Sequence, residues 1–110
     1  MFKIIIASFP FLEIDKAKNR PLVVLANSPQ TNTCIVGFLT SKTDKHILES
    51  DVLIPFSEEN QIITKLQVDT VLRLHKIGSI DKNTITQELG YIPEELTLLI
   101  KSKLKNLFSL

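Results

Sequence analysis

The stretch KNRPLVVLA (Lys18–Ala26) decides how the chain folds, because it fixes where a buried strand begins. Proline lacks a backbone N–H and is confined to a strand's first residue or to a sheet edge. A strand is therefore predicted over residues 20–26, with Arg20 at its boundary. The turn-forming residues 27–32 (NSPQTN) separate it from a second apolar run, residues 33–40 (TCIVGFLT). The two runs are predicted to pair as an antiparallel hairpin.

More strands are predicted on both sides of this hairpin. Residues 3–8 (KIIIAS) form a β-branched strand, and residues 9–19 form a polar loop that Pro10 interrupts. Gly37, inside the second run of the hairpin, predicts a bulge or a close backbone approach.

The middle of the chain is predicted to be extended as well. A short strand at 51–56 is followed by a loop at 57–61 (SEENQ). The alternating apolar residues of 66–80 predict extended structure, which Gly78 bends or divides into two strands. Residues 81–92 hold a short turn, with Asp81 as its N-cap, and a last extended piece.

The segment 93–110 (PEELTLLIKSKLKNLFSL) is the clearest helix. Pro93 suits the first helical position, acidic residues stand in the first turn, and lysines follow toward the other end. Apolar residues at helical spacing form one stripe: Leu96, Leu99, Ile100, Leu104 and Leu107. Core packing is the preferred interpretation of the stripe, and part of it could form a subunit contact.

These elements predict a mainly β fold closed as a small, strongly bent antiparallel barrel with a C-terminal α-helix. The 110 residues match one domain over 1–110. Strands and helices do not alternate in this prediction, which weighs against a dinucleotide-binding fold. The three glycines are also too far apart to build a G-x-G-x-x-G motif.

Composition narrows the class of protein. The chain is 44% hydrophobic and 23% charged with a net charge of +1, so no overall basic field indicates nucleic acid. The single cysteine, Cys34, cannot form an internal disulfide, and its apolar surroundings predict a small buried side chain. No stretch approaches the length of a membrane span, so we expect a cytoplasmic protein with no membrane partner.

The ends of the hairpin strands carry the candidate chemistry. Antiparallel pairing through residues 27–32 brings Arg20 near Thr40 and Ser41 at one rim, which Lys18 and Lys42 can also reach. A guanidinium fork matches phosphate oxygens, and a threonine hydroxyl can donate to a developing oxyanion. The cluster therefore suits a phosphodiester, although strand ends often carry such residues with no function.

Other polar residues give weaker signals. No His, Cys or carboxylate grouping has metal-ligand spacing, so neither a metal nor a cofactor is expected. His46 and His75 belong to no motif, and His75 is interpreted as a structural or surface residue. Arg73 and Lys76 are equally available for RNA or for no ligand.

Five fragments in order carry a family resemblance: FPF (Phe9–Phe11), KxRP with its apolar run (Lys18–Leu25), LTS (Leu39–Ser41), VLRLHKIGSIDKNTI (Val71–Ile85) and LGYIPEEL (Leu89–Leu96). Over nearly the whole chain this set resembles the PemK/MazF family of bacterial toxins, which are the toxin halves of type II toxin–antitoxin pairs. The resemblance implies an SH3-like barrel with a C-terminal helix, a homodimer and a cognate antitoxin.

The same resemblance implies a metal-independent endoribonuclease that cleaves single-stranded RNA through attack by the substrate's own 2′-OH. Arg20 and Thr40 take the catalytic positions. Further contacts with the RNA are expected from six residues: Lys18, Ser41, Phe9, Phe11, Arg73 and Lys76. The first loop lacks the glycines that are usual in the family, which affects its expected shape.

Three other functions stay open at this point. A toxin of the same fold could bind a protein target such as DNA gyrase through the helix end near Phe108 and Leu110. A catalytically weakened family member, or a non-toxic barrel that binds nucleic acid or peptide, would have a similar sequence.

Overall fold

A computed structural model describes residues 2–8, 19–43 and 47–110. In these ranges six strands and two α-helices follow the order β1, β2, β3, β4, α1, β5, β6, α2. The strands are β1 (Lys3–Ser8), β2 (Asn19–Asn27), β3 (Thr33–Thr40), β4 (Asp51–Ile54), β5 (Thr70–Asp81) and β6 (Ile85–Tyr91). The helices are α1 (Glu58–Thr64) and α2 (Glu94–Phe108).

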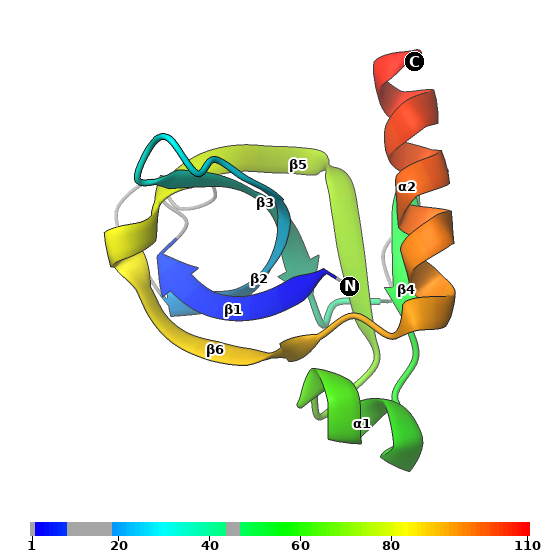
Figure 1. Ribbon diagram of the computed structural model, residues 1–110. Coiled ribbons are helices and arrows are strands. Elements are labelled where there is room, and N and C mark those ends of the chain that lie inside the picture. Colours follow the sequence, from blue (N-terminus) through cyan, green and yellow to red (C-terminus); the bar gives the residue numbers. More distant parts are fainter. Residues whose placement is uncertain (1, 9–18, 44–46) are drawn as a thin grey trace.

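The strands form one antiparallel sheet in the order β4-β5-β3-β2-β1-β6. The sheet curls into the barrel-like ring of Figure 1, where a short 3₁₀ turn at Lys82–Thr84 leads from β5 to β6. The predicted mainly β fold with a C-terminal helix is confirmed, and so is the β2–β3 hairpin. The ring leaves β4 and β6 as edge strands.

Two hydrophobic clusters lie on opposite faces of β1, β2 and β3, because successive side chains of a strand point to opposite sides. The first cluster joins these strands to β4, β5 and α2, and it includes Ile4, Val23, Leu39, Leu72 and Ile100. The second comprises Ile5, Ala7, Leu22, Cys34, Val36 and Ile80. Side chains on this second face continue toward Arg20 and Thr40 at the strand ends.

Gly37 lies where the side chain of Leu72 closely approaches β3 and where the register between β3 and β5 breaks. A glycine inside a strand predicts such a bulge or close approach. A Cβ atom there would lie 2.9 Å from Leu72 Cδ1. The β3–β5 register shifts at the same place, from Gly37 opposite Ile77 to Phe38 opposite Arg73. β5 turns sharply along its length in Figure 1. Of the two outcomes predicted for Gly78, a bend or a division, the division is wrong, because residues 70–81 form one continuous strand.

The loop predicted at 57–61 is also wrong, because α1 begins there. Ser57 is the N-cap, and its side chain accepts a hydrogen bond from the Asn60 backbone N–H at 3.0 Å. Glu58 and Glu59 occupy the first turn, where negative charge is favoured. Asp81 caps the 3₁₀ turn as predicted, accepting from the Asn83 N–H.

The C-terminal helix α2 packs through only part of its apolar stripe. Ile100 is fully buried, whereas Leu99 and Leu107 stay exposed, so core packing accounts for the stripe in part. Pro93 is the N-cap and not the first helical residue, since its backbone is not helical. Neither α1 nor α2 is long and apolar enough to span a membrane, a finding that covers the described residues.

Candidate functional site

The β2–β3 hairpin brings Arg20 and Thr40 to the same end of the sheet. Leu22 pairs with Phe38 and Val23 with Gly37. The pairing ends at Leu22 and Phe38, and Arg20 and Thr40 each lie two residues further along their strands, on the face of the sheet that also carries Leu22 and Phe38. The register therefore places Arg20 and Thr40 at the same end of the hairpin.

Arg20 lies on a strand held from both sides. Ala7 of β1 is its partner on one side, and β3 lies on the other. Ala7 is fully buried and small, which leaves room for the longer arginine side chain beside it. The Arg20 guanidinium carbon lies 6.0 Å from the centroid of the Phe38 ring, in the range of a cation–π contact. The ring and the neighbouring strands thus hold the charge at the end of β2.

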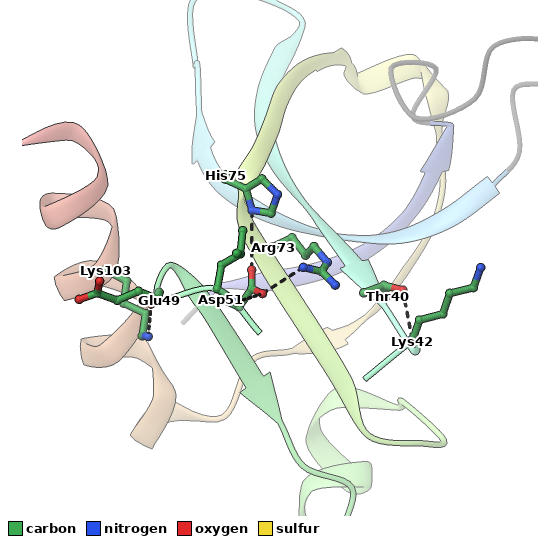
Figure 2. A network of polar contacts seen from close by, with 8 residues as sticks. Thr40, Lys42, Glu49, Asp51, Arg73, His75 and Lys103 are labelled. Carbon is green, nitrogen blue, oxygen red and sulfur yellow. Dashed lines mark hydrogen bonds and ion pairs between the residues drawn. The ribbon is translucent and has the colours of Figure 1, made fainter. Parts of the chain in front are cut away.

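The Thr40 hydroxyl is fixed by the backbone that follows β3. The Lys42 N–H donates to Thr40 Oγ1 at 3.1 Å, as Figure 2 shows. Because the oxygen accepts this bond, the hydroxyl proton is directed to another acceptor. Thr40 is half-buried, and Ser41 and Lys42 beside it are exposed. A ligand oxygen at this rim can therefore meet an oriented donor.

Arg73 joins the same face from β5. It stands opposite Phe38 on one side and opposite Asp51 of β4 on the other. Its Nη1 donates to Asp51 Oδ2 at 3.1 Å, and His75 Nδ1 lies 3.7 Å from Asp51 Oδ1. Figure 2 shows the Arg73 and His75 side chains meeting at the Asp51 carboxylate. Of the two β5 residues proposed from the sequence as RNA contacts, Arg73 and Lys76, it is Arg73 that borders the hairpin site.

The remaining residues predicted to contact RNA are not placed at the hairpin site by the described part of the structure. Lys76 is exposed in the stretch of β5 where the pairing with β3 is interrupted. Phe9, Phe11 and Lys18 lie outside the described residues. The sequence analysis did not identify Asp51, because an acidic residue at the start of an apolar strand is a weak signal. It also did not predict the contact between Asp51 and His75.

Cys34 lies at the opposite end of the hairpin, paired with Asn27. Burial raises the pKa of its thiol above the ordinary value, and the nearby Lys82 opposes this effect in part. A raised pKa disfavours the reactive thiolate. Cys34 is buried, which agrees with the small core side chain predicted for it.

No group of three or more His, Cys, Asp or Glu side chains that could hold a metal ion occurs in the part of the chain that the structure describes. A cleft of about 420 Å³ lies away from the hairpin site, with Val24–Asn27, Cys34 and Lys82 among its lining residues. Arg20 and Thr40 do not line it. The described side chains at and beside the hairpin end offer a guanidinium, a hydroxyl and the Asp51–Arg73–His75 network.

Solved structures share this fold. The Mycobacterium tuberculosis toxin MazF-mt6 is 18% identical, with 98% of this chain and 97% of that chain covered and a TM-score of 0.75. An endoribonuclease in complex with its cognate antitoxin, from a mycobacterial species, is 14% identical, with 98% and 92% covered and a TM-score of 0.73. No curated protein matches the chain.

The family comparison covers almost the full length. The model of the PemK-like, MazF-like toxins of type II toxin–antitoxin systems matches residues 1–108. This match agrees with the fold and with the order of the sequence fragments that carry the resemblance. The chain belongs to the PemK-like, MazF-like toxin family of type II toxin–antitoxin systems.

Proposed function

We propose that this toxin is a metal-independent endoribonuclease that cleaves single-stranded RNA, mRNA included, in the cytoplasm. The observation that carries the proposal is the β2–β3 register, in which Arg20 and Thr40 each lie two residues beyond the pair Leu22–Phe38, at the same end of the hairpin. Family membership supports the same assignment. Arg20 and Thr40 are the proposed catalytic residues.

The reaction joins the substrate's 2′-oxygen to phosphorus and breaks the bond from phosphorus to the 5′-oxygen. The products are a 2′,3′-cyclic phosphate and a 5′-hydroxyl. Negative charge grows on the phosphoryl oxygens in the transition state, where the guanidinium fork of Arg20 and the Thr40 hydroxyl donate. Losing one such donor typically costs about 2.7–4 kcal/mol of transition-state stabilisation.

The bases of single-stranded RNA also need contacts beyond the reacting phosphate. Ser41 and Arg73 border the hairpin end and are proposed to hold neighbouring phosphates. Lys76, Lys18, Phe9 and Phe11 are proposed as outer contacts for phosphates and bases.

The test uses purified protein, an end-labelled single-stranded RNA and EDTA. We expect wild-type protein to cleave under these conditions and Arg20→Ala to lose cleavage. Lys101→Ala removes an exposed cation from α2 and serves as the matched control for lost charge. A requirement for added metal, or unchanged cleavage by Arg20→Ala, would contradict the proposal.

A cognate antitoxin and a second copy of the chain are the proposed protein partners. One of the similar structures is of an endoribonuclease in complex with its cognate antitoxin, which supports the first. Apolar side chains exposed on α2, Leu98 among them, offer surface for association. Light scattering of the purified protein, alone and with the neighbouring gene product, tests both.

A second candidate function is inhibition of a protein target such as DNA gyrase. It is favoured by the exposed end of α2, where Phe108 is 52% and Leu110 90% exposed. In Figure 1 this end of the helix stands away from the barrel. Under this alternative Phe108→Ser and Leu110→Ser abolish toxicity, Arg20→Ala does not, and cellular RNA stays intact.

A further inference from the structure

Phe38 lies on β3, which pairs with β2 on one side and with β5 on the other. Its Cα partners are Leu22 on β2 and Arg73 on β5. The side chain is half-buried and packs against the second hydrophobic cluster. The ring is therefore anchored in the core on one side and open to a further contact on the other.

Arg20 is the diagonal neighbour of Phe38 across the β2–β3 pair. It lies two residues before Leu22, on the same face of the sheet. Diagonal neighbours stand roughly 7–8 Å apart, within reach of aromatic and long side chains. The guanidinium carbon of Arg20 lies 6.0 Å from the centroid of the Phe38 ring, so the two side chains do meet.

The sheet bends at this position. Gly37 pairs with Ile77 and the next residue, Phe38, pairs with Arg73, so residues 74–76 of β5 fall between these two partners. Extra residues in one strand bend a sheet and re-aim the side chains beside them. The orientation of the Phe38 ring is therefore set by the break in register as well as by its packing.

A second arginine stands on the other side of Phe38 in the sheet. Arg73 Nη1 donates to Asp51 Oδ2 at 3.1 Å, and the Asp51 side chain is fully shielded from solvent (Figure 2). This carboxylate offsets the charge of Arg73, which would otherwise repel the Arg20 guanidinium across the ring. Two arginines can therefore stand on either side of one phenylalanine.

A contact with the face of a ring suits an arginine that binds phosphate. An arginine side chain has many rotamers, and ordering it when the substrate binds costs free energy. A cation over a ring is attracted by the negative face of the π system, and this contact uses none of the N–H donors. The guanidinium can thus be fixed while its fork stays able to donate to phosphate oxygens.

We propose, on the basis of the function proposed above, that Phe38 is the positioning residue of Arg20 and acts through the negative face of its ring. The ring holds the guanidinium in place before RNA binds, so that its donors meet the phosphoryl oxygens as negative charge develops on them. Phe38 itself makes and breaks no bond.

Fluorinated phenylalanines at position 38 test the electrostatic part of this role. Fluorine withdraws electron density from the ring face and leaves the shape of the side chain nearly unchanged. Cleavage of labelled RNA is measured under single-turnover conditions for wild type and for variants with mono-, di- and trifluorophenylalanine at this position. We expect the maximal rate to fall with each added fluorine, while the RNA concentration that gives half the maximal rate changes little.

Natural substitutions bracket this series. Phe38→Leu removes the ring and keeps an apolar side chain, and it should lower the maximal rate by roughly 2- to 30-fold, the range expected for a lost cation–π contact. Phe38→Tyr keeps the ring face and should retain most of the rate. Phe56→Leu, at an exposed phenylalanine between β4 and α1, is the matched control and should match wild type.

The mobility of the Arg20 side chain tests the contact without reference to cleavage. The order parameter of its Nε–H bond, measured by ¹⁵N relaxation, should be lower in Phe38→Leu than in wild type and Phe38→Tyr. If Phe38→Leu does not fold, the fluorinated variants, which keep the ring, decide the proposal.

Three results would each overturn the role of Phe38. They are equal maximal rates across the fluorinated series, an effect confined to the half-maximal RNA concentration, which would indicate stacking on a base, and an equally ordered Arg20 in wild type and Phe38→Leu. Absence of cleavage by wild type would instead contradict the proposed function. The order parameter would then still decide whether the ring holds Arg20.

Discussion

Arg20 and Thr40 lie at the same end of the β2–β3 hairpin, each two residues beyond the paired residues Leu22 and Phe38 and on the same face of the sheet as these two. One residue lies on a central strand, and the other has its hydroxyl oxygen held by the Lys42 N–H. Preorganised donors of this kind stabilise developing charge without reorganising during the reaction.

Removal of the Thr40 hydroxyl should slow RNA cleavage without unfolding the protein. Thr40→Val keeps the side-chain shape and loses the donor, so we expect a loss of roughly 10²-fold or more in single-turnover rate. Thr40→Ser keeps the hydroxyl and should retain most activity. Equal rates for the valine and serine variants would show that the hydroxyl takes no part.

The packing of α2 predicts a sharp contrast between two of its residues. Ile100 is fully buried in the first core cluster, and Ile100→Ala should lower the free energy of unfolding by about 2–5 kcal/mol. Leu98 is 77% exposed, so Leu98→Ala should change it by less than about 0.5 kcal/mol. Urea denaturation measures both, and similar losses would mean that α2 packs differently.

Gly90 of β6 lies against the backbone of α1. A Cβ atom at this position would lie close to Ile63 O, and 2.7 Å from Thr64 O, where backbone cannot yield easily. Gly90→Ala should therefore lower the melting temperature, with a loss of about 1–3 kcal/mol. Gln87→Ala, at an exposed position of the same strand, is the control. Unchanged melting of Gly90→Ala would contradict the close approach.

The raised pKa of the Cys34 thiol predicts how stability depends on pH. Burial favours the protonated thiol in the folded protein, so the folded pKa exceeds the unfolded one. The resulting stabilisation is present below the unfolded pKa and is lost as the pH rises through the folded pKa. Melting temperatures at pH 7 to 10 should fall more steeply for wild type than for Cys34→Ala. Parallel curves would argue against a thiol shielded by burial.

The hairpin could be predicted from the sequence because its signals are local. The turn at 27–32 sets which residues face each other. The start predicted from Pro21 is wrong by one residue, because β2 begins at Asn19, and Arg20 and Pro21 both pair with β1. The register from this turn suffices to place Arg20 and Thr40 at the same end of the hairpin. The long C-terminal helix was equally predictable, since its apolar spacing and end charges agree.

The missed features depend on contacts between distant segments. α1 is short and has little apolar periodicity, and it is held by the Ser57 cap and by packing near β6. Asp51 and Arg73 are 22 residues apart, and only the β4–β5 register brings them together. Gly78 stays within one strand, because the register break occurs where Gly37 meets β5.

The central claim is tested most directly by inducing the wild-type protein and Arg20→Ala in growing cells and measuring growth together with the integrity of total mRNA. We expect growth arrest with fragmented mRNA for wild type. We expect normal growth with intact mRNA for Arg20→Ala at equal protein level. Arrest by Arg20→Ala, or arrest by wild type while mRNA stays whole, would contradict a nuclease centred on the end of the β2–β3 hairpin.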